Sequence, residues 1–524
     1  MEVKNQTPEQ FIKSLYNKTN RKDRAAFLCG FLMCLAVNMF VYTNTCFSHD
    51  SIKIFSDSDG LANGRILVGP LFELVNRMQL PWVIGLISCA LMGFIIVYLA
   101  RIYNLKSTLN ILLAAGIVVT SDTVVSFHFY FSSLHIYLVS LLLAVMAVYY
   151  SDRIKYGYFL SVFLLCLSML IYQAFLATAI GLFIFKLIEL LFDDKNTLKK
   201  HFASILKYAS ICIVSALLYY VIWQLTLRLS GAQIVDYYAY EGIQSGERAG
   251  IITTLVNAFV ISLYQFLGSP NNFFALSTVF VALTVLSLVF LVVKKKKRIN
   301  QLFLIVYIFV YILSVNTVYI MSGSVSYSLT VFSLVLAPLT LLSLIDNMDS
   351  AKHIKSGVAI KWVAVVLSAV LVFGQSVYAN SFYLKIKLNY DNAWSYATRL
   401  IDRLEQTEGF DENSEIVLVG EMFQITPYPD NADIKERFLY PSKSNYSCSS
   451  FVNNNAITYC ETLEWFINQE MDMDINITSD PDWAYEDESI MNMNEFPKEG
   501  SIVQKDGKFI VKISDDGSNA ESVN

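Results

Sequence analysis

Charged residues are scarce in this chain: they make up 16% of its 524 residues, against about 25% in an average soluble protein. The sequence contains no Cys-x-x-Cys pair, no zinc-ligand spacing, no phosphate-binding loop and no Gly-x-Ser-x-Gly segment. These absences argue against a redox enzyme, an ATP-driven pump and a serine hydrolase. The sequence also shows no basic face and no nucleic-acid recognition motif, so nucleic acid is not expected as a partner.

Apolar residues dominate the chain instead. They form 55% of it, and its mean hydropathy is +0.47. Because a helix needs about 20 apolar residues to cross a bilayer, the sequence predicts a polytopic α-helical membrane protein with about eleven spans. The predicted spans are 25–45, 80–100, 107–121, 133–150, 157–171, 175–191, 203–229, 274–293, 299–320, 325–345 and 358–379.

Positive charge orients these spans, since Lys and Arg collect in cytoplasmic loops. The basic tail 1–24 and the run 294–298 then lie inside, whereas segments 121–132 and 172–174, which hold neither Lys nor Arg, lie outside. The stretch 251–268 is apolar but is interrupted by Thr, Asn, Ser and Gln. A twelfth span there would move 294–298 outside, so we expect an interfacial or re-entrant helix.

The chain changes character at about residue 380. Residues 380–524 contain 27 acidic and 11 basic residues, whereas the rest carries a net charge of +11. The predicted parts are a cytoplasmic tail 1–24, a transmembrane domain 25–379 with external loops 46–79 and 230–273, and a small acidic external α/β domain 380–524.

Several patterns are expected inside this external domain. A helix is predicted at 391–408, strands at 416–420 and 509–513, and a disordered tail at 514–524. Cys448 and Cys460 are its only cysteines, and an oxidising exterior would allow them to form a disulfide.

Two carboxylates stand near predicted outer ends of spans. Asp50 follows the first span, next to His49, where it is positioned to take a proton from an acceptor hydroxyl as a general base. A solvated acid at a helix end is the plainer interpretation. Asp122, at the outer end of the third span, fits either a helix cap or a second carboxylate that joins Asp50 to hold a divalent cation or orient an acceptor sugar. No complete set of metal ligands is predicted.

Three arginines, Arg65, Arg228 and Arg248, lie outside near apolar segments. Arg binds phosphate through two parallel hydrogen bonds, so each is a candidate partner of a phosphate leaving group, and interfacial snorkelling is the alternative. Arg65 ranks first because it follows Gly64 and precedes a predicted surface helix.

That surface helix is predicted to begin at Pro70, because Pro is tolerated at the first helical position. Glu73, a candidate substrate-binding residue, would lie on its polar side. Its apolar face would consist of Leu71, Leu74, Val75 and Met78.

Two pairs of polar residues near the spans complete the candidates. His128 and His135 are seven residues apart, but nothing around them resembles a metal site, so we expect core or interfacial histidines with satisfied hydrogen bonds. Tyr172 and Gln173 occupy a turn between two spans, where capping is the default role and substrate binding the functional alternative.

The order of short motifs along this chain is similar to that in the bacterial serotype-converting glucosyltransferases of the GtrII type. The resemblance covers nearly the whole chain, and its motifs are short. They are Ser-His-Asp-Ser at 48–51, Gly-Arg-Ile-Leu at 64–67, the segment 81–88 that opens the second span, Leu-Ile-Tyr-Gln-Ala-Phe at 170–175, and the closing strand segments 500–503 and 509–511.

The resemblance implies a membrane fold of the GT-C type. Its members move a sugar, usually glucose, from undecaprenyl phosphate to O-antigen or another surface polysaccharide, at the outer face of the bacterial cytoplasmic membrane. It implies an acidic residue in the first external loop as the base or acceptor-orienting group, and this position falls on Asp50. A donor-lipid synthase and a small flippase would be partners, besides the lipid bilayer itself.

We therefore expect an inverting glycosyltransferase, and two other classes stay open. A transporter or flippase of lipid-linked sugars would show paired halves and charges near mid-membrane, which the sequence does not show. A structural or assembly protein would not depend on Asp50 for catalysis.

Overall fold

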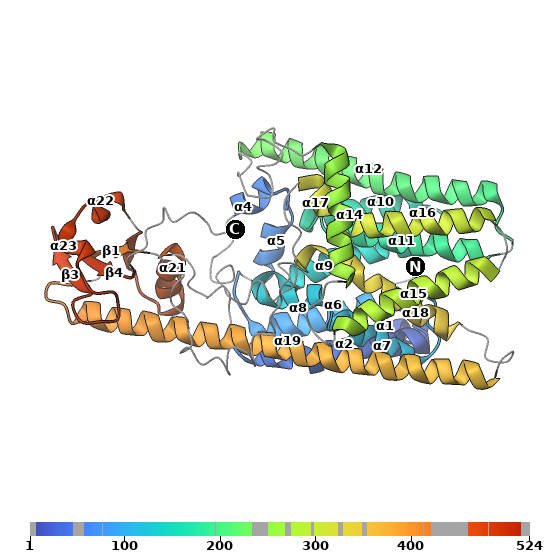
Figure 1. The fold of residues 1–524 in the computed structure, drawn as a ribbon, viewed down its shortest axis with the longest axis horizontal. Helices are drawn as coiled ribbons and strands as arrows, with labels where there is room; N and C mark the ends of the chain where they lie inside the picture. The colour runs from blue at the N-terminus through green and yellow to red at the C-terminus, as the bar shows by residue number, and fades with distance from the viewer. Residues whose placement is uncertain are drawn as a thin grey trace.

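The computed structural model describes most of the chain, and Figure 1 shows a helical bundle and a smaller sheet-containing region joined by one long helix. The described residues are 7–45, 57–75, 77–193, 195–232, 250–267, 274–294, 298–322, 328–347, 354–411, 413–420, 460–479 and 481–514.

Helices joined by short turns form the bundle. The first half consists of α1 (Pro8–Lys18), α2 (Arg21–Thr43), α4 (Asp57–Ala62), α5 (Val68–Glu73), α6 (Pro81–Ile102), α7 (Thr108–Val119), α8 (Asp122–Phe129), the 3-10 turn η1 (Phe131–Ser133), α9 (Leu134–Tyr150), α10 (Gly157–Ile171), α11 (Phe175–Phe192) and α12 (Leu198–Ser230). The second half consists of α14 (Ile251–Leu267), α15 (Phe274–Lys294), α16 (Arg298–Val315), α17 (Thr317–Ser322), the 3-10 turns η2 (Ser328–Thr330) and η3 (Phe332–Val335), α18 (Leu336–Asp346) and α19 (Ile354–Glu405).

Each of the eleven predicted apolar stretches overlaps helical structure. Among the described residues, seven helices are long and apolar enough to cross a membrane, and the bent pair α7–α8 makes an eighth. The helices α10, α15 and α18 are shorter apolar ones. The structure thus confirms a mostly helical protein with several helices able to span a membrane, whereas the number of spans stays a prediction.

The third predicted stretch, 107–121, corresponds to α7 and is followed at once by a second, bent helix. The helix breaks after α7 and resumes at Asp122 in α8, with a bend of 49°. Hydroxyl groups compensate for the break: Thr120 Oγ1 donates to the Gly116 carbonyl at 2.8 Å, and Ser121 Oγ donates to the Val118 carbonyl at 2.7 Å. Asp122 therefore lies just after the end of α7, at the bend, and its place at the outer end of the span stays a prediction.

Helices α2 and α6 pack closely along their lengths. A Cβ atom on Gly30 would lie 2.9 Å from the Cα of Gly93, so only glycine allows this approach, as is common between membrane helices. At one end Arg101 donates to Asp23 from Nε at 2.9 Å and from Nη2 at 2.6 Å. This two-pronged ion pair sets how the two helices align.

The stretch predicted as interfacial or re-entrant is helix α14. Figure 1 shows α14 lying across the bundle, whereas α12 and α16 run along it. Two of the polar residues that interrupt its apolar sequence face inward: Asn316 Nδ2 donates to Ser262 Oγ at 2.7 Å and to Gln265 Oε1 at 2.9 Å. Its opposite face is exposed and apolar, and its interfacial or re-entrant placement stays a prediction.

The predicted surface helix is wrong in its bounds. The helix α5 ends at Glu73, and the backbone turns through a left-handed conformation at Arg77, with φ of 54°. Leu74 and Met78, predicted to be apolar-side residues, are 76% and 54% exposed. The side chains that this segment does bury are those of Val68, Phe72 and Val75.

The long helix α19 connects the bundle to the sheet region. It is continuous over 52 residues, so the predicted span 358–379 and the predicted helix 391–408 are parts of one element. Figure 1 shows it running along the length of the molecule.

The sheet region follows α19. Its strands are β1 (Glu415–Val419), β2 (Asn476–Ser479), β3 (Ile502–Lys505) and β4 (Lys508–Lys512), and its helices are α21 (Cys460–Glu470), α22 (Asp482–Tyr485) and α23 (Glu488–Met491). The strand order is β2-β1-β4-β3, with β1 parallel to β2 and to β4 and with β3 antiparallel to β4. The strands predicted at 416–420 and 509–513 are confirmed as β1 and β4. Cys448 and residues 515–524 lie outside the described residues.

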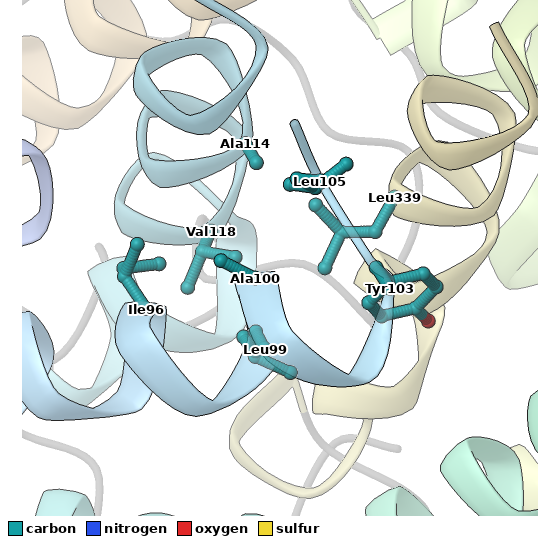
Figure 2. Close-up of a pocket in the computed structure, with 8 residues that line it drawn as sticks. All are labelled: Ile96, Leu99, Ala100, Tyr103, Leu105, Ala114, Val118 and Leu339. Atoms are coloured by element: carbon teal, nitrogen blue, oxygen red, sulfur yellow. The ribbon is translucent and has the colours of Figure 1, made fainter. Parts of the chain in front are cut away.

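One small cavity lies inside the bundle (Figure 2). Its volume is about 10 Å³, which is room for one water molecule. The side chains around it are apolar, and the Tyr103 hydroxyl donates to the Leu336 carbonyl at 3.2 Å. Its lining consists of Ile96, Leu99, Ala100, Tyr103, Leu105, Ala114, Val118 and Leu339. This cavity is too small and too apolar to bind a sugar.

Candidate active site

Two turns far apart in sequence meet at the end of the bundle that faces the sheet region (Figure 1). One is the Asn63-Gly64-Arg65 turn after α4, and the other is the Tyr172-Gln173 turn between α10 and α11. Gln173 Nε2 donates to the Asn63 carbonyl and to the Tyr219 hydroxyl, each at 2.8 Å. The amide of Gln173 thus holds both turns against α12.

Glycine is needed at position 64 for two reasons. Its φ is +72°, in the left-handed region, and a Cβ there would lie 2.2 Å from the Tyr219 hydroxyl. One helical turn further along α12, Trp223 Nε1 donates to the Leu61 carbonyl at 2.9 Å. Asn63, Tyr219 and Trp223 were not predicted from the sequence as site residues. The only signal was a pair of polar-tipped aromatics four residues apart near the end of an apolar helix.

Arg65 emerges from this braced turn. Its backbone N–H donates to the Gly60 carbonyl at 2.7 Å, and its guanidinium carbon lies 5.1 Å from the centre of the Tyr172 ring. The Tyr172 ring is itself held by Tyr137, with ring centres 4.9 Å apart. A guanidinium stacked on an aromatic face keeps its N–H edges directed outward in the plane, so this arrangement suits binding of an anion.

A second polar cluster lies between α2, α8 and α19. His128 Nδ1 lies 2.7 Å from the Val124 carbonyl, and its Nε2 lies 3.0 Å from the Tyr42 hydroxyl. Because a carbonyl only accepts, we assign the proton to Nδ1, and Nε2 then accepts from Tyr42. Tyr383 donates to Asn38 Oδ1 at 2.7 Å. His128 is therefore a core histidine with satisfied hydrogen bonds, as predicted.

His135 differs from that prediction. Its side chain is buried at the start of α9, and neither ring nitrogen makes a hydrogen bond of normal geometry with the described residues. The described part of the chain contains no group of three or more His, Cys, Asp or Glu side chains able to hold an ion.

The other described candidates do not join Arg65. Asp122, the half-buried first residue of α8, accepts a hydrogen bond from Ser126 Oγ at its carbonyl oxygen, at 2.8 Å. Glu73 forms an ion pair with Arg77 at 2.6 Å, and Arg228 is exposed in the last turn of α12. The structure thus brings together Arg65, Tyr172 and Gln173. Three further candidates, His49, Asp50 and Arg248, lie outside the described residues.

These features define a class: a membrane protein with a many-helix bundle, a cation-bearing turn at one end, and a small sheet region beyond that end. The family model for the glucosyl transferase GtrII matches residues 39–385, which is more than half of the chain. The protein therefore belongs to the GtrII glucosyltransferase family, and the resemblance noted from its motifs is confirmed. Neither the curated proteins nor the solved structures include a match to the chain.

Proposed function

We propose that the protein transfers glucose from a polyprenyl-phosphate carrier to a surface polysaccharide such as O-antigen, at the outer face of the bacterial cytoplasmic membrane. Family membership supports glucose transfer, and the apolar helices support a membrane location. The observation that carries the proposal is the braced position of Arg65 over Tyr172.

Loss of a polyprenyl phosphate places negative charge on the departing phosphate oxygen. A cation held in place before the reaction stabilises that charge without having to reorganise. The Arg65 turn meets this requirement, because Gln173 and Trp223 tie its segment to two other parts of the bundle. Arg65 is accordingly our phosphate-binding residue, with Tyr172 and Gln173 as its supports.

The reaction also needs a base. In the proposed step the acceptor hydroxyl oxygen attacks the anomeric carbon and forms the new glycosidic bond. The bond from that carbon to the phosphate oxygen breaks, its electron pair stays on the phosphate, and the acceptor proton passes to Asp50. A single displacement of this kind inverts the anomeric centre. Asp122 is the second candidate for the base, and His49 and Arg248 are candidate substrate contacts.

The flanking parts have proposed roles in the same scheme. The basic N-terminal tail lies in the cytoplasm, and the acidic domain 380–524 lies outside, where it meets the polysaccharide. A donor-lipid synthase supplies the carrier-linked sugar, and a small flippase brings it to the outer face. A divalent cation between Asp50 and Asp122 is the alternative way for these carboxylates to act.

The test is transfer by the purified protein in nanodiscs, with undecaprenyl-phosphate-glucose and a panel of surface glycans. We expect Asp50→Asn to reduce transfer by about 100-fold or more while donor binding is retained. An Asp50→Asn variant as active as the wild type would remove Asp50 as the base, and Asp122→Asn then becomes the variant to measure. NMR of the product anomeric centre, compared with that of the donor, tests inversion.

Arg65 has a matched control in Arg228. Arg65→Lys keeps the charge but loses the planar two-pronged contact, so transfer should fall by about tenfold or more. Arg228→Lys should stay within about twofold, since that side chain is exposed at the end of α12. Equal losses in both variants would argue for general surface attraction. If the wild type transfers no sugar but moves labelled lipid-linked sugar across vesicle membranes, the protein is instead a transporter.

A further inference from the structure

A pair of buried side-chain amides joins α14 to the break between α16 and α17, and the proposed reaction does not yet use them. Asn316 stands at this break and is 0% exposed. Its Nδ2 donates to Gln265 Oε1 at 2.9 Å and to Ser262 Oγ at 2.7 Å, both on α14. The two amides are therefore in direct contact inside the bundle.

Each amide of this pair keeps one polar atom open. Asn316 Oδ1 and Gln265 Nε2 are both buried, and neither forms a hydrogen bond with any described residue. The first is an acceptor and the second is a donor. Burying such atoms without partners is unfavourable. This place in the fold is therefore incomplete by one donor and one acceptor, on two groups that already touch.

The same conclusion holds whichever end of each amide carries the nitrogen. Exchanging nitrogen and oxygen in Asn316 alone would bring two acceptor oxygens together, and exchanging them in Gln265 alone would bring two donor nitrogens together. Exchanging both restores a hydrogen bond between the amides, but again leaves one donor and one acceptor open. The need for a further group is thus independent of the assignment.

Asn316 is also not used as a helix cap. Its backbone carbonyl accepts from the Ile320 N–H at 3.0 Å in the first turn of α17. At the start of a helix, an Asn side-chain oxygen normally accepts from the first backbone N–H groups. Here Oδ1 accepts no such bond, because the side chain is turned toward α14. Its acceptor is therefore available to another group.

The amide pair lies toward the end of the bundle that carries the candidate active site. Val315, the residue before Asn316, packs on Val331. The next ring, Phe332, lies 6.3 Å from Phe175 between ring centres. Phe175 opens α11 just after the turn that supports the phosphate-binding arginine. Figure 1 shows α17 toward the same end of the bundle.

We propose that Asn316 and Gln265 bind one hydroxyl group of the sugar carried by the donor lipid. A hydroxyl can donate and accept at the same time, so one such group satisfies both open atoms. Its O–H donates to Asn316 Oδ1, and its oxygen accepts from Gln265 Nε2. Gln265 is only partly buried, so the site is approached from its side.

This inference rests on the proposed function and deepens it, because it adds a contact that selects the sugar rather than the phosphate. A site built to hydrogen-bond a substrate hydroxyl discriminates strongly against an analogue that lacks it, since the polar groups of the protein are then left unpaired. A water molecule offers the same hydrogen-bonding chemistry as a sugar hydroxyl, and the experiment separates the two.

The experiment measures donor binding to the full-length protein in nanodiscs by native mass spectrometry, without acceptor glycan. The probes are undecaprenyl-phosphate-glucose and its monodeoxy analogues, each of which lacks one hydroxyl group. The variants are Asn316→Leu and Gln265→Met, which keep the size of the side chain and remove the amide. Asn257→Leu is the matched control, because Asn257 is an exposed residue of α14 that donates to the Tyr319 hydroxyl at 3.3 Å.

One monodeoxy donor should bind the wild type about tenfold or more weakly than the glucose donor, because both amide atoms then stay unpaired. Asn316→Leu and Gln265→Met should weaken binding of the glucose donor by a similar factor and leave that monodeoxy donor within about threefold of its wild-type Kd. Asn257→Leu should keep the wild-type pattern. If Asn316→Leu does not fold, Gln265→Met, at the partly exposed position, carries the test.

Equal losses for the glucose donor and every analogue in the amide variants would overturn the proposal, because the amides would then be structural or hold only water. Unchanged affinities would overturn it as well. The outcome is separate from the transfer assay. If the wild type transfers no sugar but shows the expected pattern, the proposed function fails and this contact stands, whereas transfer of glucose without the pattern gives the reverse.

Discussion

The side-chain amide of Gln173 and the hydroxyl of Tyr219 are 2.8 Å apart and join the α10–α11 turn to α12. The same amide nitrogen reaches the Asn63 carbonyl, two residues before Arg65. The position of the Arg65 guanidinium therefore depends on contacts among three separate segments of the bundle. If Arg65 binds the donor phosphate as proposed, its function should be sensitive to changes in residues that touch no substrate.

Removal of the Tyr219 hydroxyl should show this sensitivity. Tyr219→Phe is expected to lower the free energy of unfolding by about 1 kcal/mol, the usual net value of one hydrogen bond, and to lower kcat/KM by about tenfold through the displaced turn. The measurements are thermal unfolding and transfer rates. Tyr220→Phe is the control, since Tyr220 is exposed beside it. If the two variants behave alike, Tyr219 does not brace the site.

Gly64 and Gly231 provide a matched pair of glycines. Both have positive φ, +72° and +69°, but a Cβ at Gly64 would clash with the Tyr219 hydroxyl, and a Cβ at Gly231 meets nothing within 4 Å. Gly231→Ala should cost about 1 kcal/mol in stability from backbone strain alone. Gly64→Ala should cost about 1–3 kcal/mol more from the clash and should reduce transfer. Equal Tm values in the two variants would contradict the observed packing.

Asp152, at the turn between α9 and α10, contacts two lysine side chains. It accepts hydrogen bonds from Lys207 Nζ and the Tyr208 hydroxyl, each at 2.7 Å, and it pairs with Lys186. Asp152→Ala would leave two ammonium groups side by side. Because the Asp152 side chain is 36% exposed, solvent screening reduces the cost from the 3–5 kcal/mol of a buried pair to about 1–3 kcal/mol.

Thermal unfolding of detergent-solubilised protein checks the effect of Asp152→Ala. Asp193→Ala is the comparison, because Asp193 only caps a backbone N–H in an exposed turn, and it should change the Tm little. High salt should partly rescue Asp152→Ala by screening the repulsion between the two lysines. A rescue of the same size in Asp193→Ala would remove this explanation.

The stability of the sheet region should depend on Asp487. Hydrogen bonds from Lys505 and Ser489 lower the pKa of Asp487 to about 2, from an ordinary value of 3.8. The unfolded chain then binds a proton more readily than the folded one, so this contribution to stability is present above about pH 4 and is lost as the pH falls toward 2.

Hydrogen exchange of the β3 and β4 amides, corrected for intrinsic rates, measures this dependence. Asp487→Asn should exchange faster than the wild type at pH 6 and should converge with it near pH 2. Glu488→Gln, at an exposed neighbouring position, should keep the wild-type profile. A gap between Asp487→Asn and wild type that is the same at both pH values would show that the effect is not the ionisation of Asp487.

Much of the fold follows from local sequence patterns. The apolar runs at 80–100 and 175–191 predict α6 and α11 to within a few residues, because a span must satisfy its own backbone hydrogen bonds in lipid. The strands at 416–420 and 509–513 follow from β-branched runs ended by Gly or Asp. The family motifs around Asp50, Arg65 and Tyr172 were also visible in the sequence.

Local patterns failed where a contact from elsewhere decides the outcome. The helix expected to continue through Leu74 and Met78 ends at Glu73, and the chain turns at Arg77. Likewise the bend of 49° before Asp122 was not predicted; there Thr120 Oγ1 donates to Gln375 of α19 at 2.8 Å, a contact that apolarity does not reveal.

The sequence by itself determined the class of this protein, since the length, polarity and charge of each segment decide what enters a membrane and on which side its loops are expected. Only the tertiary structure decided which turns meet. Asn63 and Gln173 are 110 residues apart, and their hydrogen bond depends on how the helices pack.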